Sequence, residues 1–201
     1  MKTFTTLTLA FAFVLFGATA ASAQTEKVVL AGGCFWGMQA VFADLKGVTN
    51  TVAGYSGGNA LTAHYEIVST GATGHAESVE ITYDPAKISF KQLLDVYFLV
   101  AHDPTELNRQ GPDEGTQYRS EIYYTTPSQL SQAQAYIAKL TSAKTFSAPI
   151  VTKLAPLNGF YTAESYHQNF VKNNPSNGYV VYNDLPKLQN LKQKYPQLVK
   201  N

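Results

Sequence analysis

Residues 31–37 (AGGCFWG) hold the only cysteine and the only tryptophan of the 201-residue chain, side by side and bracketed by glycines. The apolar run at 28–30 (VVL) that precedes them predicts a short buried strand. The residues that follow have apolar side chains at the helical spacing i, i+3, i+4 and i+7, and Gly47 is a stop signal. Those side chains are Met38, Val41, Phe42 and Leu45. We therefore expect Cys34 at a strand-to-helix turn, at or next to the helix N-terminus.

This position affects the chemistry that a lone cysteine can perform. The free backbone N–H groups and the positive dipole end of a helix N-terminus stabilise an anion, and a thiolate is such an anion. The pattern therefore predicts a reactive thiol with a lowered pKa at Cys34. The alternative is a small buried apolar residue, which is the most frequent role of a lone cysteine. The residue pattern leaves both interpretations open.

Residues 1–23 are typical of a secretory signal peptide. A positive charge near the start is followed by an apolar core at 7–16 and by a small-residue cleavage site that ends at Ala23. We expect a periplasmic or secreted protein with no membrane association after cleavage, because the apolar core is too short to span a bilayer. A retained anchor and a lipoprotein signal ending at Cys34 are alternatives. The polar residues 24–27 argue against the lipoprotein signal.

The composition limits the classes of partner. Loss of residues 1–23 removes one lysine and brings the formal net charge from +1 to about 0, with no basic stripe, which argues against nucleic acid or an acidic partner. Residues 24–201 are long enough for a single domain. One cysteine in an oxidising compartment cannot form an intramolecular disulfide, so a free thiol favours a catalytic role. The four histidines lack metal-ligand spacing, so no metal is expected.

The remaining pattern predicts alternating strands and helices. Further strands are predicted at 49–55, 77–83, 117–124 and 150–154. Helices are predicted at 161–171, at 187–194 and after two capping boxes, Ser89 with Gln92 and Thr126 with Gln129. The polar loop at 105–115 is a candidate site loop. We expect an α+β fold: a two-layer α/β sandwich with a mixed sheet, a ferredoxin-like core and loosely packed C-terminal helices. A doubly wound parallel sheet is the alternative, although the third and fourth predicted elements lack the crossover helix that such a sheet needs.

Glu77 begins a strand whose side chains alternate between two faces. The apolar residues Val79, Ile81 and Tyr83 share one face, and Glu77 has the same parity. We therefore expect its carboxyl to point inward from the start of the strand. A carboxyl removed from water should have a raised pKa. The alternative is a solvated carboxylate at the end of a strand.

Residues 33–37 (GCFWG) resemble the signature of the A-type peptide methionine sulfoxide reductases. Further blocks agree in order and spacing: 73–77 (TGHAE), 108–113 (NRQGPD) continuing to 117–120 (QYRS), and 161–168 with its YHQ end. The resemblance covers residues 27–180. It implies reduction of the S-epimer of methionine sulfoxide, free or in proteins, and hence repair of oxidative damage in an exported compartment.

The resemblance also implies roles for particular residues. Cys34 would attack the sulfoxide sulfur, and Glu77 would protonate the leaving oxygen, consistent with the inward placement expected above. Tyr65 and Tyr118 match the two hydroxyl donors to that oxygen. Asp113 matches a polar residue that helps to set the site, although Pro112 beside it replaces a more common asparagine.

The substrate's S-methyl group would lie against two aromatic side chains, Phe35 and Trp36. The first step would leave a sulfenic acid on Cys34. Many family members then form a disulfide with a cysteine just after a Gly-Tyr pair, but here Val180 follows that pair and the tail at 183–187 resembles the branch that lacks this cysteine. The resemblance therefore implies recycling by an external thiol, either thioredoxin-like, glutaredoxin-like or small. It also implies a monomer without a bound cofactor.

Two other functional classes fit parts of the sequence. A Cys–His hydrolase would use His75, His102 or His167, which must then lie within hydrogen-bond reach of the thiol. A secreted binding module could present some of the thirteen tyrosines as a ligand platform. The binding module would leave Cys34 and Glu77 without a role.

Overall fold

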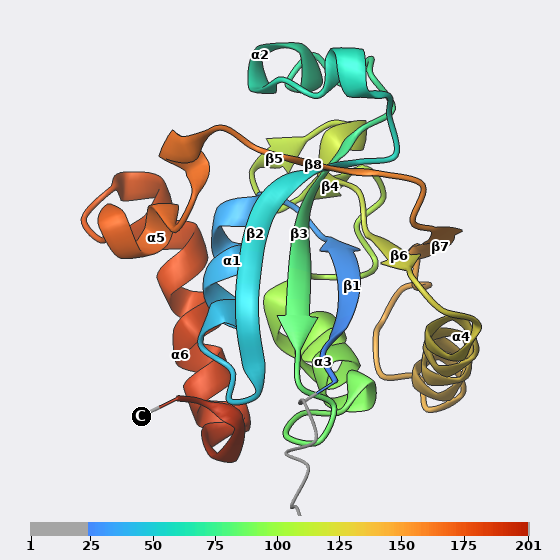
Figure 1. The fold of residues 1–201 in the computed structure, drawn as a ribbon. Coiled ribbons are helices and arrows are strands. Elements are labelled where there is room, and N and C mark those ends of the chain that lie inside the picture. The colour runs from blue at the N-terminus through green and yellow to red at the C-terminus, as the bar shows by residue number, and fades with distance from the viewer. Residues whose placement is uncertain (1–23, 201) are drawn as a thin grey trace, which may run out of the picture.

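The computed structural model describes residues 24–200, so the signal peptide predicted at 1–23 lies outside the described residues. Its main sheet contains β1 (Glu26–Ala31), β2 (Val48–Ser56), β3 (Ala76–Tyr83), β6 (Glu121–Tyr124), β7 (Lys153–Pro156) and β8 (Phe160–Thr162). The strand order is β7-β6-β1-β3-β2-β8 (Figure 1). Neighbouring strands are antiparallel except for the parallel pair β6 and β7. A separate hairpin pairs β4 (Arg109–Gln110) with β5 (Asp113–Glu114).

Helices cover the sheet and extend into the C-terminal tail. The α-helices are α1 (Phe35–Ala43), α2 (Tyr65–Val68), α3 (Phe90–Val96), α4 (Pro127–Ser142), α5 (Phe170–Asn173) and α6 (Leu185–Lys194). The shorter 3₁₀ and π turns are η1 (Ala60–Thr62), η2 (Tyr97–Ala101), η3 (Thr116–Tyr118), η4 (Ser165–His167), η5 (Val180–Asp184) and η6 (Pro196–Leu198). Helix α1 packs on β2 and β3, α6 packs against α1, and α3 packs against α4 (Figure 1).

The core lies where α1 meets the central strands. Val28 and Leu30 of β1 pair in register with Ile81 and Val79 of β3, and all four side chains are fully buried. The apolar face predicted for residues 79–83 is therefore confirmed. Strand β1 is also buried on its other face, as expected of a central strand with a continuous apolar run. The predicted α+β class, with a mixed sheet and helices, is confirmed. No helix among residues 24–200 is long and apolar enough to cross a membrane.

The prediction of a helix at 161–171 is wrong. The structure has strand β8, turn η4 and the four-residue helix α5 there. Tyr161 pairs with Tyr55 on the edge of β2, which extends the chain. The Gln168 side chain then hydrogen-bonds both backbone groups of Ala53: it accepts from the N–H at 3.0 Å and donates to the C=O at 2.9 Å. These contacts satisfy backbone groups of β2 beyond its pairing with β8. The periodicity of residues 161–171 carries no information about them.

The strand prediction at 117–124 is correct only in its second half. The first half is turn η3, because Thr116 donates to the Gly71 carbonyl at 2.7 Å and Gln117 donates to the Ser69 carbonyl at 3.2 Å. The last predicted strand, 150–154, is shifted along the chain to β7. The capping box at Ser89 is confirmed in both directions. Thr126 caps α4, but the Gln129 side chain accepts from the Thr125 amide and does not complete that box.

Gln168 offers a test of how the tail is attached to the sheet. Replacing Gln168 with Ala leaves the Ala53 N–H without its side-chain acceptor, so the free energy of unfolding should fall by about 1–3 kcal/mol. Urea denaturation measures this change. Gln132→Ala is the matched control, since the exposed Gln132 side chain donates a hydrogen bond to Ser128 on its own helix and its loss should change stability by less than about 0.5 kcal/mol. Equal stability of the two variants would contradict this account.

Candidate active site

Cys34 lies between β1 and α1 and is the N-cap residue of the helix, as the sequence predicts. Two glycines make this turn possible. Gly33 has φ +90°, and a Cβ there would lie 2.6 Å from the Gln110 side chain. A Cβ on Gly32 would lie 2.8 Å from the His102 ring. The loop that carries Gln110 can therefore approach the backbone next to the thiol only because these positions have no side chain.

Glu77 is the second residue of β3 and points into the site beside Cys34. Its side chain is buried, with 3% exposed, and its Oε2 accepts a hydrogen bond from the Phe35 amide at 3.0 Å. Burial raises the pKa of Glu77 to about 8, and the Phe35 amide opposes this shift. The inward placement and raised pKa predicted for this carboxyl are confirmed. The alternative of a solvated strand-end carboxylate is wrong.

The prediction of a lowered pKa at Cys34 is wrong. Burial raises the pKa of the thiol well above its ordinary value, and the nearby Glu77 carboxyl acts in the same direction. The Trp36 amide at the start of the helix lowers the pKa but does not compensate for burial. Desolvation therefore outweighs the helix N-terminus. At pH 7 the thiol and the Glu77 carboxyl both hold their protons.

The two expected hydroxyl donors are placed around this pair. Tyr65 is the first residue of α2, and Tyr118 is the last residue of η3. Burial raises the pKa of each hydroxyl, and the Glu77 and Cys34 groups raise it further through their charges. Asp113 acts on Tyr118 in the same way. The structure thus brings all five expected catalytic residues into one electrostatically coupled group, in which both tyrosines remain protonated donors.

Glu164 holds Tyr65 in place, a role that no local pattern in the sequence indicates. Its Oε1 accepts from the Tyr65 amide at 3.0 Å, and its Oε2 accepts from the Tyr55 hydroxyl at 2.8 Å. The carboxylate therefore satisfies an N–H group in the first turn of α2 and links it to β2.

An aromatic cluster forms the wall next to the thiol. The Trp36 ring stacks on Phe170 with centroids 3.6 Å apart and meets Tyr179 edge-on at 5.7 Å. Its Nε1 donates to Nδ1 of His167 at 3.0 Å. Phe35, the other expected methyl contact, is buried against Tyr55 and His167. Trp36 is therefore the more accessible of the two.

Tyr179 and Asp113 connect the tail to this wall. The Tyr179 hydroxyl donates a short hydrogen bond to the Asp113 carboxyl. Burial raises the pKa of Asp113, and the bond from Tyr179 opposes that shift. In the sequence, Tyr179 is recognisable only as part of a Gly-Tyr pair. Its contact with Asp113 joins positions 66 residues apart, so no local pattern indicates it.

A further carboxyl, Asp184, is buried behind the first turn of α1. It lies against Gly37, where any Cβ would collide with its Oδ1, and its nearest cation is Lys187 at 3.6 Å. Burial raises the pKa of Asp184 to about 6. Its charge is one of those that raise the pKa of the Cys34 thiol. The tail therefore contributes to the electrostatics of the site.

The histidines have other partners. His75 accepts from the Gly58 amide and contacts the Asn59 carbonyl, and His102 bridges the Tyr97 carbonyl and the Ser120 hydroxyl. Among residues 24–200, no histidine hydrogen-bonds Cys34, which argues against a Cys–His hydrolase. In the same range no group of three or more His, Cys, Asp or Glu side chains is placed to hold a metal ion.

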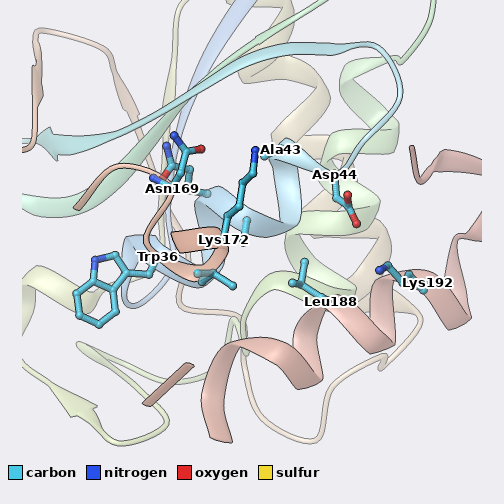
Figure 2. Close-up of a pocket in the computed structure, with 10 residues that line it drawn as sticks. Trp36, Ala43, Asp44, Asn169, Lys172, Leu188 and Lys192 are labelled. Carbon is cyan, nitrogen blue, oxygen red and sulfur yellow. The ribbon is translucent and has the colours of Figure 1, made fainter. Parts of the chain in front are cut away.

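A groove of about 430 Å³ lies between α1, residues 169–172 and α6 (Figure 2). Its lining includes Trp36, Lys172 and Lys192 but none of Cys34, Glu77, Tyr65 or Tyr118. The groove therefore borders the aromatic wall without containing the thiol chemistry.

The geometry agrees with comparisons to known proteins. The family model described as "Peptide methionine sulfoxide reductase" matches residues 26–199. The relative "Peptide methionine sulfoxide reductase MsrA 2" of Mesorhizobium japonicum is 57% identical over 178 residues, covering 89% of this chain and 91% of that protein.

Solved structures show the same likeness. Reduced Mxr1 from Saccharomyces cerevisiae is 31% identical with a TM-score of 0.72, over 79% of this chain and 90% of that one. Methionine sulfoxide reductase A of Corynebacterium diphtheriae is 35% identical with a TM-score of 0.67, over 80% of each chain. Mxr1 in complex with Trx2, at 20% identity and a TM-score of 0.52 over 77% and 91%, shares the fold. The chain therefore belongs to the peptide methionine sulfoxide reductase family and is an oxidoreductase that reduces methionine sulfoxide.

Proposed function

We propose that the protein reduces the S-epimer of methionine sulfoxide, free or in proteins, through a sulfenic acid on Cys34. The observation that carries this proposal is the buried Glu77 carboxyl beside the thiol, held by the Phe35 amide at 3.0 Å. A carboxyl that keeps its proton at pH 7 is the general acid that a leaving sulfoxide oxygen requires. The single domain at 24–201 would act outside the cytoplasm, a placement supported by the sequence pattern that predicts a signal peptide at 1–23.

The reaction needs a nucleophile and an acid at the same moment. The Cys34 sulfur attacks the sulfoxide sulfur, its thiol proton passes to the Glu77 carboxylate, and Glu77 has meanwhile delivered its own proton to the sulfoxide oxygen. The oxygen, now a hydroxyl group, leaves the substrate sulfur and bonds to the Cys34 sulfur, while the transient bond between the two sulfurs breaks. Methionine leaves reduced by two electrons, and Cys34 is oxidised to the sulfenic acid. Since both groups are protonated at rest, deprotonation of the thiol is coupled to the arrival of substrate.

The polar groups set the orientation of the substrate. Burying the S-methyl group against Trp36 contributes only about 0.8 kcal/mol, with a sulfur–aromatic contact adding about 0.3–1.5 kcal/mol. Hydrogen bonds from the Tyr65 and Tyr118 hydroxyls to the sulfoxide oxygen are geometrically specific. Asp113 acts indirectly, because it holds the Tyr179 ring against the edge of Trp36.

The sulfenic acid needs an external thiol. The chain has one cysteine. In the family that the sequence resembles, many members have a second cysteine at the position of Val180. A reductant thiol would displace water to form a mixed disulfide, and a second reductant thiol would release Cys34. Mxr1 has been solved in complex with Trx2, which supports a thioredoxin-like partner, with a glutaredoxin-like protein or a small thiol as the other candidates. The protein would act as a monomer without a bound cofactor.

Glu77→Gln should lower the single-turnover rate by roughly ten- to ten-thousandfold, because the amide keeps the shape but cannot deliver a proton. Glu80→Gln, on the other face of the same strand and paired with Lys27, is the matched control and should retain the wild-type rate. The wild-type rate should fall as the pH rises through about 8, where Glu77 loses its proton. A wild-type rate in Glu77→Gln would mean that another group protonates the oxygen.

The enzyme should consume one epimer of methionine sulfoxide. Trp36 places the methyl group and the two tyrosines place the oxygen. The third substituent of the chiral sulfur, the rest of the substrate, can then point in one direction only. Chiral chromatography of a racemic mixture after exhaustive reaction should show about half of the substrate untouched. Equal loss of both epimers would be incompatible with this three-point arrangement.

Incubation with excess methionine sulfoxide and a sulfenic-acid trap, without reductant, should give a single trapped adduct on Cys34. Mass spectrometry of the intact protein measures it, since no second cysteine can consume the sulfenic acid. Cys34→Ser should remain folded by circular dichroism, form no adduct and produce no methionine. An unmodified thiol alongside one equivalent of methionine would show that the oxidising equivalent went elsewhere.

A further inference from the structure

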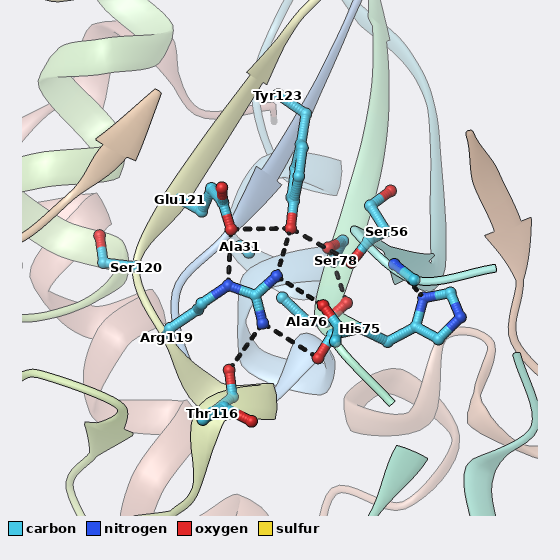
Figure 3. Close-up of polar contacts among 12 residues, drawn as sticks. Ala31, Ser56, His75, Ala76, Ser78, Thr116, Arg119, Ser120, Glu121 and Tyr123 are labelled. Carbon is cyan, nitrogen blue, oxygen red and sulfur yellow. Dashed lines mark hydrogen bonds and ion pairs between the residues drawn. The ribbon is translucent and has the colours of Figure 1, made fainter. Parts of the chain in front are cut away.

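Arg119 follows Tyr118 directly and forms the centre of a buried polar network (Figure 3). A guanidinium has five N–H donors, and each has an acceptor here. The acceptors are Glu121 Oε2 at 2.6 Å, the His75 carbonyl at 3.1 Å, the Thr116 carbonyl at 2.9 Å, the Gly74 carbonyl at 2.9 Å and the Tyr123 hydroxyl at 2.7 Å. The Arg119 and Glu121 side chains are only 12% and 9% exposed.

Three of these acceptors lie in segments that carry the proposed chemistry. Gly74 and His75 immediately precede β3, whose second residue is Glu77. Thr116 begins the turn that ends at Tyr118. The planar Arg119 side chain therefore connects the backbone that precedes Glu77 with the backbone of the turn that carries Tyr118.

The network also includes the end of β2. The Tyr123 hydroxyl donates to the Ser56 carbonyl at 3.1 Å, and Ser56 pairs with Ala76 beside Glu77. Gly57 leaves room for this arrangement, because a Cβ there would lie 2.6 Å from Nη2 of Arg119 and 2.7 Å from the Tyr123 hydroxyl. The backbone at Gly57, with φ +98°, is also in a conformation that favours glycine.

We propose that Arg119 is a positioning residue for the reduction: the hydrogen bonds of its guanidinium set the relative placement of the Glu77 carboxyl and the Tyr118 hydroxyl and so hold Glu77 in its buried position. This inference rests on the proposed function, because it assumes that Glu77 is the acid. The role is geometric, since the Arg119 charge is neutralised by Glu121 and is not among the groups that shift the pKa of Glu77.

Arg119→Lys tests this role, because lysine keeps the charge beside Glu121 but cannot make the five-donor fork. The value of kcat should fall about ten- to hundredfold, the effect expected of a small misplacement of reacting groups. The value of KM should change much less. The alkaline limb of the pH–rate profile should move to lower pH, since water reaching Glu77 would reduce the effect of burial on its pKa.

Leu140→Ala is the control for general destabilisation. Leu140 is buried on α4, and its truncation should lower the melting temperature while leaving kcat and the alkaline limb unchanged. Tyr123→Phe removes one acceptor of the network with little change of shape, so it should shift kcat and the limb in the same direction by a smaller amount. This milder variant keeps the test decisive if Arg119→Lys does not fold.

The inference would be overturned if folded Arg119→Lys or Tyr123→Phe protein had the wild-type kcat and the wild-type alkaline limb of the pH–rate profile. The same series separates this failure from failure of the proposed function. If the wild type lacks the alkaline limb, or if Glu77→Gln keeps the wild-type rate, the assignment of Glu77 as the acid is wrong instead.

Discussion

The hydrogen bond from the Phe35 amide to the buried Glu77 carboxyl is the contact on which the rest of the site depends. It joins the N-terminus of α1 to the start of β3 and satisfies a free helix N–H and a buried carboxyl oxygen together. Because water is excluded, the pKa of Glu77 rises to about 8 and the pKa of the neighbouring thiol rises as well. The resting site therefore holds a protonated carboxyl beside a protonated thiol, which is less readily oxidised than a thiolate.

The tail completes this site without a covalent link. Gln168 occupies the backbone groups of Ala53 at the sheet edge, and Tyr179 reaches from the tail to Asp113. Val180 is fully buried directly after Tyr179. Apolar burial and hydrogen bonds thus hold this segment of the tail against the site.

Much of the frame could be predicted from local patterns. The turn at Cys34, the helix after it and the inward parity of Glu77 follow from glycines and from spacing over fewer than ten residues. Residues 161–171 could not be predicted in this way, because their conformation depends on Tyr55 and Ala53 of β2. The contacts of Glu164, His167 and Arg119 could not be predicted locally either, although all three residues lie in family blocks, since each acts on a residue distant in the sequence.

The sequence by itself determined which residues are proposed to carry the chemistry: a lone cysteine at a helix start, an inward carboxyl, and family blocks in order. Only the tertiary structure decided the protonation state of the thiol. The helix N-terminus is a local feature and lowers the pKa of Cys34, but burial together with the charges of Glu77, Asp113 and Asp184 raises it further than the helix lowers it. Those groups come from β3, β5 and η5, and desolvation is a sum over everything packed around an atom, so it exists only once the chain has folded.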